Sequence, residues 1–119
     1  MKEIMAIIRQ ERINKTKEEL VKAGFSSLTA RKVLGRGRMF VDYDLMEETD
    51  GKAIGLSRGT RLMPKRIINV IVKDNEVEEI TRVIIKVNRT DNKGDGKIFV
   101  LPIDGAYRVR DGKKGNEVL

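Results

Sequence analysis

Residues 3–20, EIMAIIRQERINKTKEEL, decide the fold, because their order of strand, polar turn and helix returns at residues 66–83. Apolar side chains fall on both faces of residues 3–9, as in a central strand that is covered on both sides. The Lys/Glu-rich residues 14–23 follow, with Gly24 placed as a C-terminal stop. We therefore expect a strand and then an amphipathic helix in this segment.

The second copy, RIINVIVKDNEVEEITRV, has the same organisation. We expect a strand at residues 65–72 and then a helix that is capped by Asp74. The apolar residues of this helix recur at helical spacing: Val77, Ile80, Val83, Ile84 and Val87. This pattern predicts the clearest helix of the chain.

Three further strands complete the predicted sheet. We expect them at residues 25–34, at residues 97–101, where Pro102 interrupts the strand, and at a short edge segment, residues 107–110. The order is ferredoxin-like β-α-β-β-α-β with an extra short C-terminal strand, which predicts an α+β fold with an antiparallel sheet. The length fits a single domain, residues 1–119.

Two glycine turns carry positive charge. Gly94-Asp95-Gly96-Lys97 runs directly into Ile98-Phe99-Val100, and Gly35-Arg36-Gly37-Arg38 has the same kind of composition. Glycines let the backbone approach a ligand closely, and the neighbouring cations attract negative charge. The two turns together predict a binding site for an anion.

The composition restricts the chemistry. The chain has 25 Lys and Arg residues against 18 Asp and Glu residues, a net charge of +7, and it has no Cys and no His. Mechanisms that use a thiol or an imidazole are therefore excluded, and with no activated nucleophile or general base evident we expect a protein that is not an enzyme. The first apolar run is too short for a signal peptide, and no stretch predicts membrane insertion, so a cytoplasmic location is the default.

Residues 38–63 follow no regular pattern. Acidic residues come first and are followed by glycines and basic residues, so the charge changes sign along the segment. Long irregular segments in compact domains are usually functional, and we expect a binding loop here. A long hairpin or an insertion without a role is the alternative.

Two helices on one face of the predicted sheet leave its other face to be covered. That face carries apolar residues such as Met5, Ile7, Ile71 and Phe99. Association of several copies would cover it, and the alternative is that loops and the chain ends do so. In an oligomer, a cleft between subunits is a sensible location for the two glycine turns.

These motifs together resemble the PII nitrogen-regulatory signal proteins. The resemblance rests on Thr29, Gly35-x-Gly37-Arg38, Pro64-Lys65, Thr90-x-x-x-Gly94-Asp95-Gly96-Lys97-Ile98-Phe99-Val100, and Arg108-x-Arg110 followed by Gly112. The Gly-Asp-Gly-Lys-Ile-Phe segment is highly specific to that family, and the similarity spans nearly the whole chain apart from the long loop. Residues 61–66, residues 84–88 and the enlarged loop look most like the nitrogenase-associated branch, in particular its second member.

The resemblance implies a trimer with three nucleotide sites between neighbouring subunits. It also implies a long loop, called the T-loop, that projects from each subunit at about residues 38–62. By motif match, the phosphates of ATP or ADP would be held by Gly35, Gly37, Arg38, Gly94, Asp95, Gly96 and Lys97. Arg108 and Arg110 would reach in from a neighbouring subunit, and Thr29 and the strand around Ile71 would meet the adenine.

The family likeness further implies a sensor of nitrogen status. 2-Oxoglutarate would bind beside the nucleotide through Mg²⁺ with its distal carboxylate on Lys65, and both ligands would change the ordering of the T-loop. The implied target is the dinitrogenase component of nitrogenase, and the implied assembly is a homotrimer or a mixed assembly with a sister PII-like protein. Uridylylation of Tyr43 is not expected, because the surrounding loop does not match the modified segment of the enteric-type relatives.

Three other functions compete with this one. Within the family, the alternative is a general PII regulator of ammonium transport or glutamine synthetase. An RNA-binding module can share the element order, but it would stack bases on sheet aromatics, and this chain has only three Phe and two Tyr, so we expect no nucleic-acid partner. A small enzyme that acts on a nucleotide is the third, and it lacks an evident nucleophile or base.

Met39 departs from the family pattern, in which a Gln follows the arginine and offers an amide oxygen to the metal. A thioether is a poor ligand for Mg²⁺, which demands oxygen donors. No metal ligand is therefore assigned among the side chains. We expect 2-oxoglutarate to bind with a different set of oxygens here or to bind weakly.

Met39→Gln is accordingly expected to tighten the binding of 2-oxoglutarate, because it restores an oxygen donor for Mg²⁺. Calorimetric titration of 2-oxoglutarate into the ATP-saturated protein measures this effect, with EDTA in place of Mg²⁺ as the control. An unchanged affinity in Mg²⁺ would refute the metal argument.

Overall fold

The computed structural model describes residues 1–36 and 62–119. Its main elements are β1 (Lys2–Arg9), α1 (Ile13–Lys22), β2 (Thr29–Gly35), β3 (Met63–Val72), α3 (Val77–Asn88) and β4 (Gly96–Pro102). Gly37, Arg38, Met39, Tyr43 and the predicted T-loop, apart from Leu62, lie outside the described residues.

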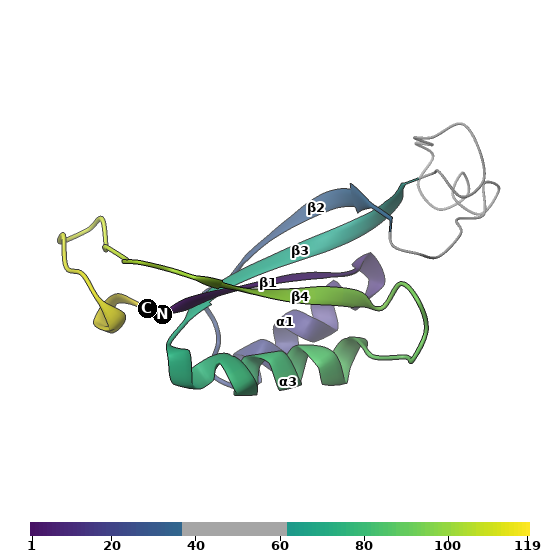
Figure 1. Cartoon of the computed structure of the whole chain (residues 1–119), viewed down its shortest axis with the longest axis horizontal. Coiled ribbons are helices and arrows are strands. Elements are labelled where there is room, and N and C mark those ends of the chain that lie inside the picture. The colour runs from purple at the N-terminus through teal and green to yellow at the C-terminus, as the bar shows by residue number, and fades with distance from the viewer. Residues whose placement is uncertain (37–61) are drawn as a thin grey trace.

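The four strands form one antiparallel sheet in the order β2-β3-β1-β4. Both helices lie side by side on the same face of this sheet, and none of the described residues forms a helix on the opposite face (Figure 1). This arrangement confirms the predicted ferredoxin-like α+β fold.

The core lies between the helices and one face of the central strand. Ile4, Ala6 and Ile8 alternate along β1 and are at most 2 % exposed. Since successive side chains of a strand point to opposite faces, the intervening residues of β1 lie on the open face. The helices cover the buried side with apolar residues that include Leu20, Ile80 and Ile84.

A buried polar bond joins the two helices. Thr16 of α1 and Asn88 of α3 are both buried, and the Asn88 amide Nδ2 donates to the Thr16 Oγ1 at 3.0 Å. The same amide donates to the Ile84 carbonyl at 2.9 Å. A buried polar side chain needs such partners, so this bond fixes how the C-terminal end of α3 lies on α1.

The segment after α1 differs from its prediction as a strand. Gly24 has a φ of 97° and its N–H donates to the Val21 carbonyl, while the Phe25 N–H donates to the Leu20 carbonyl at 2.8 Å. These two bonds are the Schellman motif that ends many helices, and Gly24 is the helix stop that was expected. Phe25 is the last residue of that motif and packs into the core, and β2 begins only at Thr29.

Two other predictions of local structure are wrong. Asp74 does not cap α3, because its carboxylate pairs with the Met1 amino group at 2.9 Å and a short 3₁₀ turn, Asp74–Glu76, precedes the helix. The extra strand expected at residues 107–110 is reduced to a single bridge between Tyr107 and Lys114. The chain turns there, since Gly112 has a φ of 72° and its N–H donates to the Arg108 carbonyl.

No helix within the described ranges is long and apolar enough to cross a bilayer.

Candidate functional site

Gly35, Arg36 and the Gly94–Lys97 turn lie at one end of the open sheet face. The pairing register places Ile7 of β1 opposite both Ile67 and Lys97, and Arg9 opposite Lys65. Gly35, at the end of β2, pairs with Met63 at this same end. The turn that leads into β4 also lies here, so segments far apart in the sequence meet at one end of the sheet (Figure 1).

A groove of about 620 Å³ occupies this end. Its volume is within the range of small-molecule sites. The lining residues are Ile7, Gly35, Arg36, Lys65, Lys93, Gly94, Gly96, Lys97 and Phe99. Within the described residues, this lining combines four cations with two large apolar side chains and contains no carboxylate, so it suits an anion that carries an apolar part.

Glycine is required where the turn enters β4. Gly96 has a φ of 121°, and a Cβ atom built on it would lie 2.0 Å from the Ile7 carbonyl oxygen. Gly94, with a φ of 97°, also has a conformation that side chains rarely adopt. Any larger residue at position 96 must push β4 away from β1, so the absence of a side chain brings this turn against the central strand.

Asp95 lies in the turn, and its carboxylate is engaged there. It accepts hydrogen bonds from the Thr90 N–H at 2.6 Å and from the Thr90 hydroxyl, and it pairs with the Arg9 guanidinium at 2.6 Å. The bonds from Thr90, and then the cation Arg9, hold the pKa of the Asp95 carboxyl well below its usual range. Asp95 is therefore ionised and occupied, and it is not among the residues that line the groove.

Lys65 is a buried cation at the floor of the groove. Only 8 % of the residue is exposed, and its Nζ donates to the Gly94 carbonyl at 3.1 Å. Burial lowers the pKa of this ammonium, and the neighbouring Arg9 lowers it further. An anionic group close to Lys65 would stabilise its charged form, which is the electrostatic basis for expecting a carboxylate partner there.

The structure brings only part of the predicted site together in one chain. The members that line the groove are Gly35, Lys65, Gly94, Gly96 and Lys97. Thr29 lies at the opposite end of β2, six residues from Gly35, which corresponds to about 20 Å of strand. Ile71 is likewise six residues, about 20 Å, from Lys65 along β3.

The two predicted arginines are also at the far end. They belong to the C-terminal segment, which follows β4 and extends from the end of the sheet opposite the groove (Figure 1). Arg108 donates to the Asp111 carboxylate at 2.8 Å, and Arg110 is exposed. Thr29, Ile71, Arg108 and Arg110 therefore cannot reach the groove of their own chain.

Sequence reasoning missed several residues of this site. Arg36, Lys93 and Phe99 line the groove, and Arg9 and Thr90 hold its turn. The sequence places Phe99 on the open face, and its spacing of two residues from Lys97 could also have assigned it to the site. Nothing in the sequence pairs Arg9 with Asp95, since the two are 86 positions apart.

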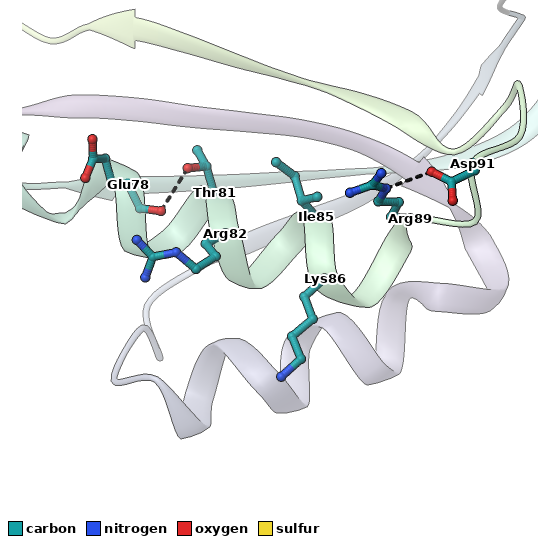
Figure 2. A pocket seen from close by; sticks show the side chains of 7 residues that line it. All are labelled: Glu78, Thr81, Arg82, Ile85, Lys86, Arg89 and Asp91. Atoms are coloured by element: carbon teal, nitrogen blue, oxygen red, sulfur yellow. Dashed lines mark hydrogen bonds and ion pairs between the residues drawn. The ribbon is translucent and has the colours of Figure 1, made fainter.

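A second depression lies on the flank of α3 and contains no predicted site residue. It is lined by Glu78, Thr81, Arg82, Ile85, Lys86, Arg89 and Asp91, and Figure 2 shows Arg89 turned to Asp91. Its charges are mixed, and its one ion pair is exposed, at 2.8 Å. This flank therefore lacks the convergent charge that distinguishes the groove.

Fold and groove together define a ferredoxin-like domain with a cationic groove on the open face of its sheet, and the charge of this groove suits an anionic ligand. The nitrogen regulatory protein P-II family matches residues 1–113, and the chain belongs to this family. The predicted family resemblance is thereby confirmed.

Two relatives carry similar descriptions, as nitrogen fixation GlnB-like protein 2 of a nifHD or a nifHD1 region. The protein of Methanothermobacter marburgensis is 44 % identical over the full length of both chains. The nifHD1-region protein of Methanosarcina barkeri is 38 % identical over 100 % of this chain and 99 % of its own. The chain is thus similar throughout to GlnB-like proteins of nitrogen fixation regions.

A solved structure extends the comparison. The Arabidopsis thaliana PII protein bound to citrate superposes with a TM-score of 0.73 at 30 % identity, over 98 % of this chain and 86 % of that one. Proteins of this family are signalling regulators and not enzymes, so the chain is a PII-family nitrogen regulator.

Gly96→Ala is expected to lower the free energy of unfolding by at least about 2 kcal/mol, because its Cβ meets a backbone oxygen that cannot rotate away. Denaturation at a fixed chain concentration measures this loss. Gly112→Ala is the matched control, since Gly112 also has a positive φ but no atom lies within 4 Å of a Cβ there. Equal losses in the two variants would show that the contact with Ile7 does not matter.

Proposed function

We propose that this chain is a sensor of nitrogen status that binds ATP or ADP between neighbouring copies of itself, or of a sister chain, and regulates nitrogenase by direct contact. The observation that carries the proposal is the separation of the predicted site into two halves at opposite ends of one open sheet face. Each chain would contribute its glycine end to one site and its arginine end to another.

The separation supports a ring of subunits. A contact between two different surface patches generates a closed ring when the rotation that relates neighbouring copies returns to the first copy. The family likeness implies a ring of three copies. The open face would then be covered by neighbours, including its exposed Phe99 and Ile71. Such packing would bring the Thr29 end of one copy to the groove of the next.

The residues of the groove fit a nucleotide. The amides of the glycine turn and the ammonium of Lys97 would take the phosphates, while Ile7 and Phe99 offer an apolar wall to the base. The neighbour's Thr29 hydroxyl and β3 backbone would meet the edge of the adenine. Arg108 and Arg110 of that neighbour would add positive charge to the phosphates, with Arg108 first leaving Asp111.

The proposed 2-oxoglutarate site is tied to Lys65. Its buried ammonium would pair with the distal carboxylate of this effector, and that negative charge would offset the burial that lowers the pKa of Lys65. The described residues contain no group of three or more acidic side chains that could hold a metal ion. No step is therefore assigned to Mg²⁺.

Nitrogenase is the proposed target because of the relatives. The similar proteins of Methanothermobacter marburgensis and Methanosarcina barkeri are described by their nifHD regions, and the similarity covers all of this chain. Contact of the T-loop with the dinitrogenase component would follow the ligand state of the site. The alternative is that the chain regulates ammonium transport or glutamine synthetase.

Co-expression of two defective chains tests the shared site. Lys97→Gln removes a cation from the groove and Arg110→Gln removes one from the far end, so each variant alone should lose most ATP affinity. An intact site in the mixture needs the groove of an Arg110→Gln chain next to the far end of a Lys97→Gln chain. Random assortment of equal amounts around a ring gives this pair at about a quarter of the sites, which should bind ATP with wild-type affinity. Calorimetry measures the recovered fraction.

Matched controls make this experiment decisive. Lys97→Gln co-expressed with Lys22→Gln, an exposed lysine of α1, should leave about half of the sites intact, because the far end is intact in every chain, and this fraction checks the assortment. A double variant that carries both changes in one chain should recover nothing by itself. If the mixture of single variants gains no tight sites, the two halves do not meet between subunits.

Acetylene reduction by nitrogenase tests the target. The chain, alone and mixed with its sister chain, is expected to inhibit the dinitrogenase component when ATP or ADP is present and 2-oxoglutarate is low, and added 2-oxoglutarate should relieve the inhibition. With Lys65→Met, a higher concentration of 2-oxoglutarate should be needed to relieve the inhibition, whereas Lys22→Met should respond as the wild type does. No inhibition under any ligand condition would refute nitrogenase as the target.

A further inference from the structure

We propose that Arg9 and Asp95 act as a clamp that positions the phosphate-binding turn without either side chain contacting the phosphates. This inference rests on the proposed nucleotide site and adds two positioning residues to it. The family resemblance assigned Asp95 to the phosphates, and Arg9 had no assigned role.

Arg9 connects the end of β1 to two points of the turn. Its Nη1 donates to the Asp95 Oδ1 at 2.6 Å, and its Nη2 donates to the Lys93 carbonyl at 3.1 Å. A guanidinium presents its donors in a rigid, planar fork, so both bonds are made from one fixed orientation. The turn is thereby held against the central strand.

Asp95 completes the clamp from within the turn. Its carboxylate accepts from the Thr90 N–H and hydroxyl, which closes residues 90–95 into a loop. The side chains of Arg9 and Asp95 are each only 21 % exposed, so water screens this pair less than it screens a surface ion pair. Both oxygens of the carboxylate are in use.

The clamp controls the direction of the backbone amides. The Lys93 carbonyl points to Arg9, and the Gly94 carbonyl points to Lys65 at 3.1 Å. In a planar trans peptide, the N–H points opposite to the carbonyl. Arg9 therefore fixes the direction of the Gly94 N–H, in a turn whose two glycines would otherwise allow many conformations. Lys65 fixes the next peptide, whose Asp95 N–H donates to the Asn92 carbonyl at 3.4 Å within the turn.

If Asp95 is neutralised, a positioning role and simple electrostatics predict opposite changes in the affinity for ATP. A carboxylate beside a phosphate site repels the ligand, so its neutralisation should strengthen ATP binding if charge alone matters. If Asp95 holds the turn, Asp95→Asn should weaken ATP binding, because an amide offers one acceptor oxygen where the carboxylate uses two and it loses the charge that pairs with Arg9. The sign of the change separates the two explanations.

The experiment is a double-mutant cycle of Arg9→Gln and Asp95→Asn in the full chain, read by calorimetry with ATP. Each single variant should bind ATP about tenfold more weakly, the size expected for the loss of one charged hydrogen bond. The double variant should be little worse than either, because both changes break the same clamp. Arg82→Gln, an exposed arginine on the flank of α3 (Figure 2), is the control for the loss of one positive charge and should bind as the wild type does.

Tighter ATP binding by Asp95→Asn, or additive losses in the double variant, would overturn the clamp. Hydrogen exchange of residues 93–96 in the nucleotide-free protein provides a second measurement, and exchange should be faster in both single variants than in Arg82→Gln. If the wild type binds no ATP, the proposed nucleotide function fails. The exchange measurement then still decides whether Arg9 and Asp95 order the turn, and unchanged exchange would reject the clamp.

Discussion

The register of the central strand is the constraint on which the rest of this structure depends. β1 pairs with both β3 and β4, so its two-residue period determines the two faces of the whole sheet. Ile4, Ala6 and Ile8 point into the core beneath the helices, and Ile7 and Arg9 therefore lie on the open face. A slip of one residue in either pairing would exchange these sets and destroy the core and the groove together.

This register also explains why the two ends of the open face carry different residues. Its groove end gathers Lys65, Lys97 and the glycine turn, while Thr29 and Ile71 lie about 20 Å away along their strands. Because strands are stiff and straight over such distances, one chain cannot fold its own halves together. That rigidity supports the proposed shared site, since a second copy can supply the half that one chain cannot bring to its own groove.

Much of the fold could be predicted from local patterns. The alternation of residues 3–9, the spacing of Ile80 and Ile84, and the stop at Gly24 are each determined by near neighbours in the chain. The predictions that were wrong concern residues that bind or pack against a group far from them in the sequence or in another element. Asp74 has the residue type of a helix cap, yet the amino group of Met1 binds its carboxylate, and Phe25 has the character of a strand residue but fills the core beside α1.

The sequence by itself determined the order of strands and helices, the family and the presence of two cationic glycine turns, because these depend on side-chain period and on residues close together in the chain. Only the tertiary structure decided which residues meet. It placed Arg9 on Asp95 across 86 positions, buried Lys65 beside the Gly94 carbonyl, and separated Thr29 from Gly35. These outcomes depend on strand register and on the close approach of Gly96 to Ile7, which are set by the packing of the whole sheet and by no local pattern.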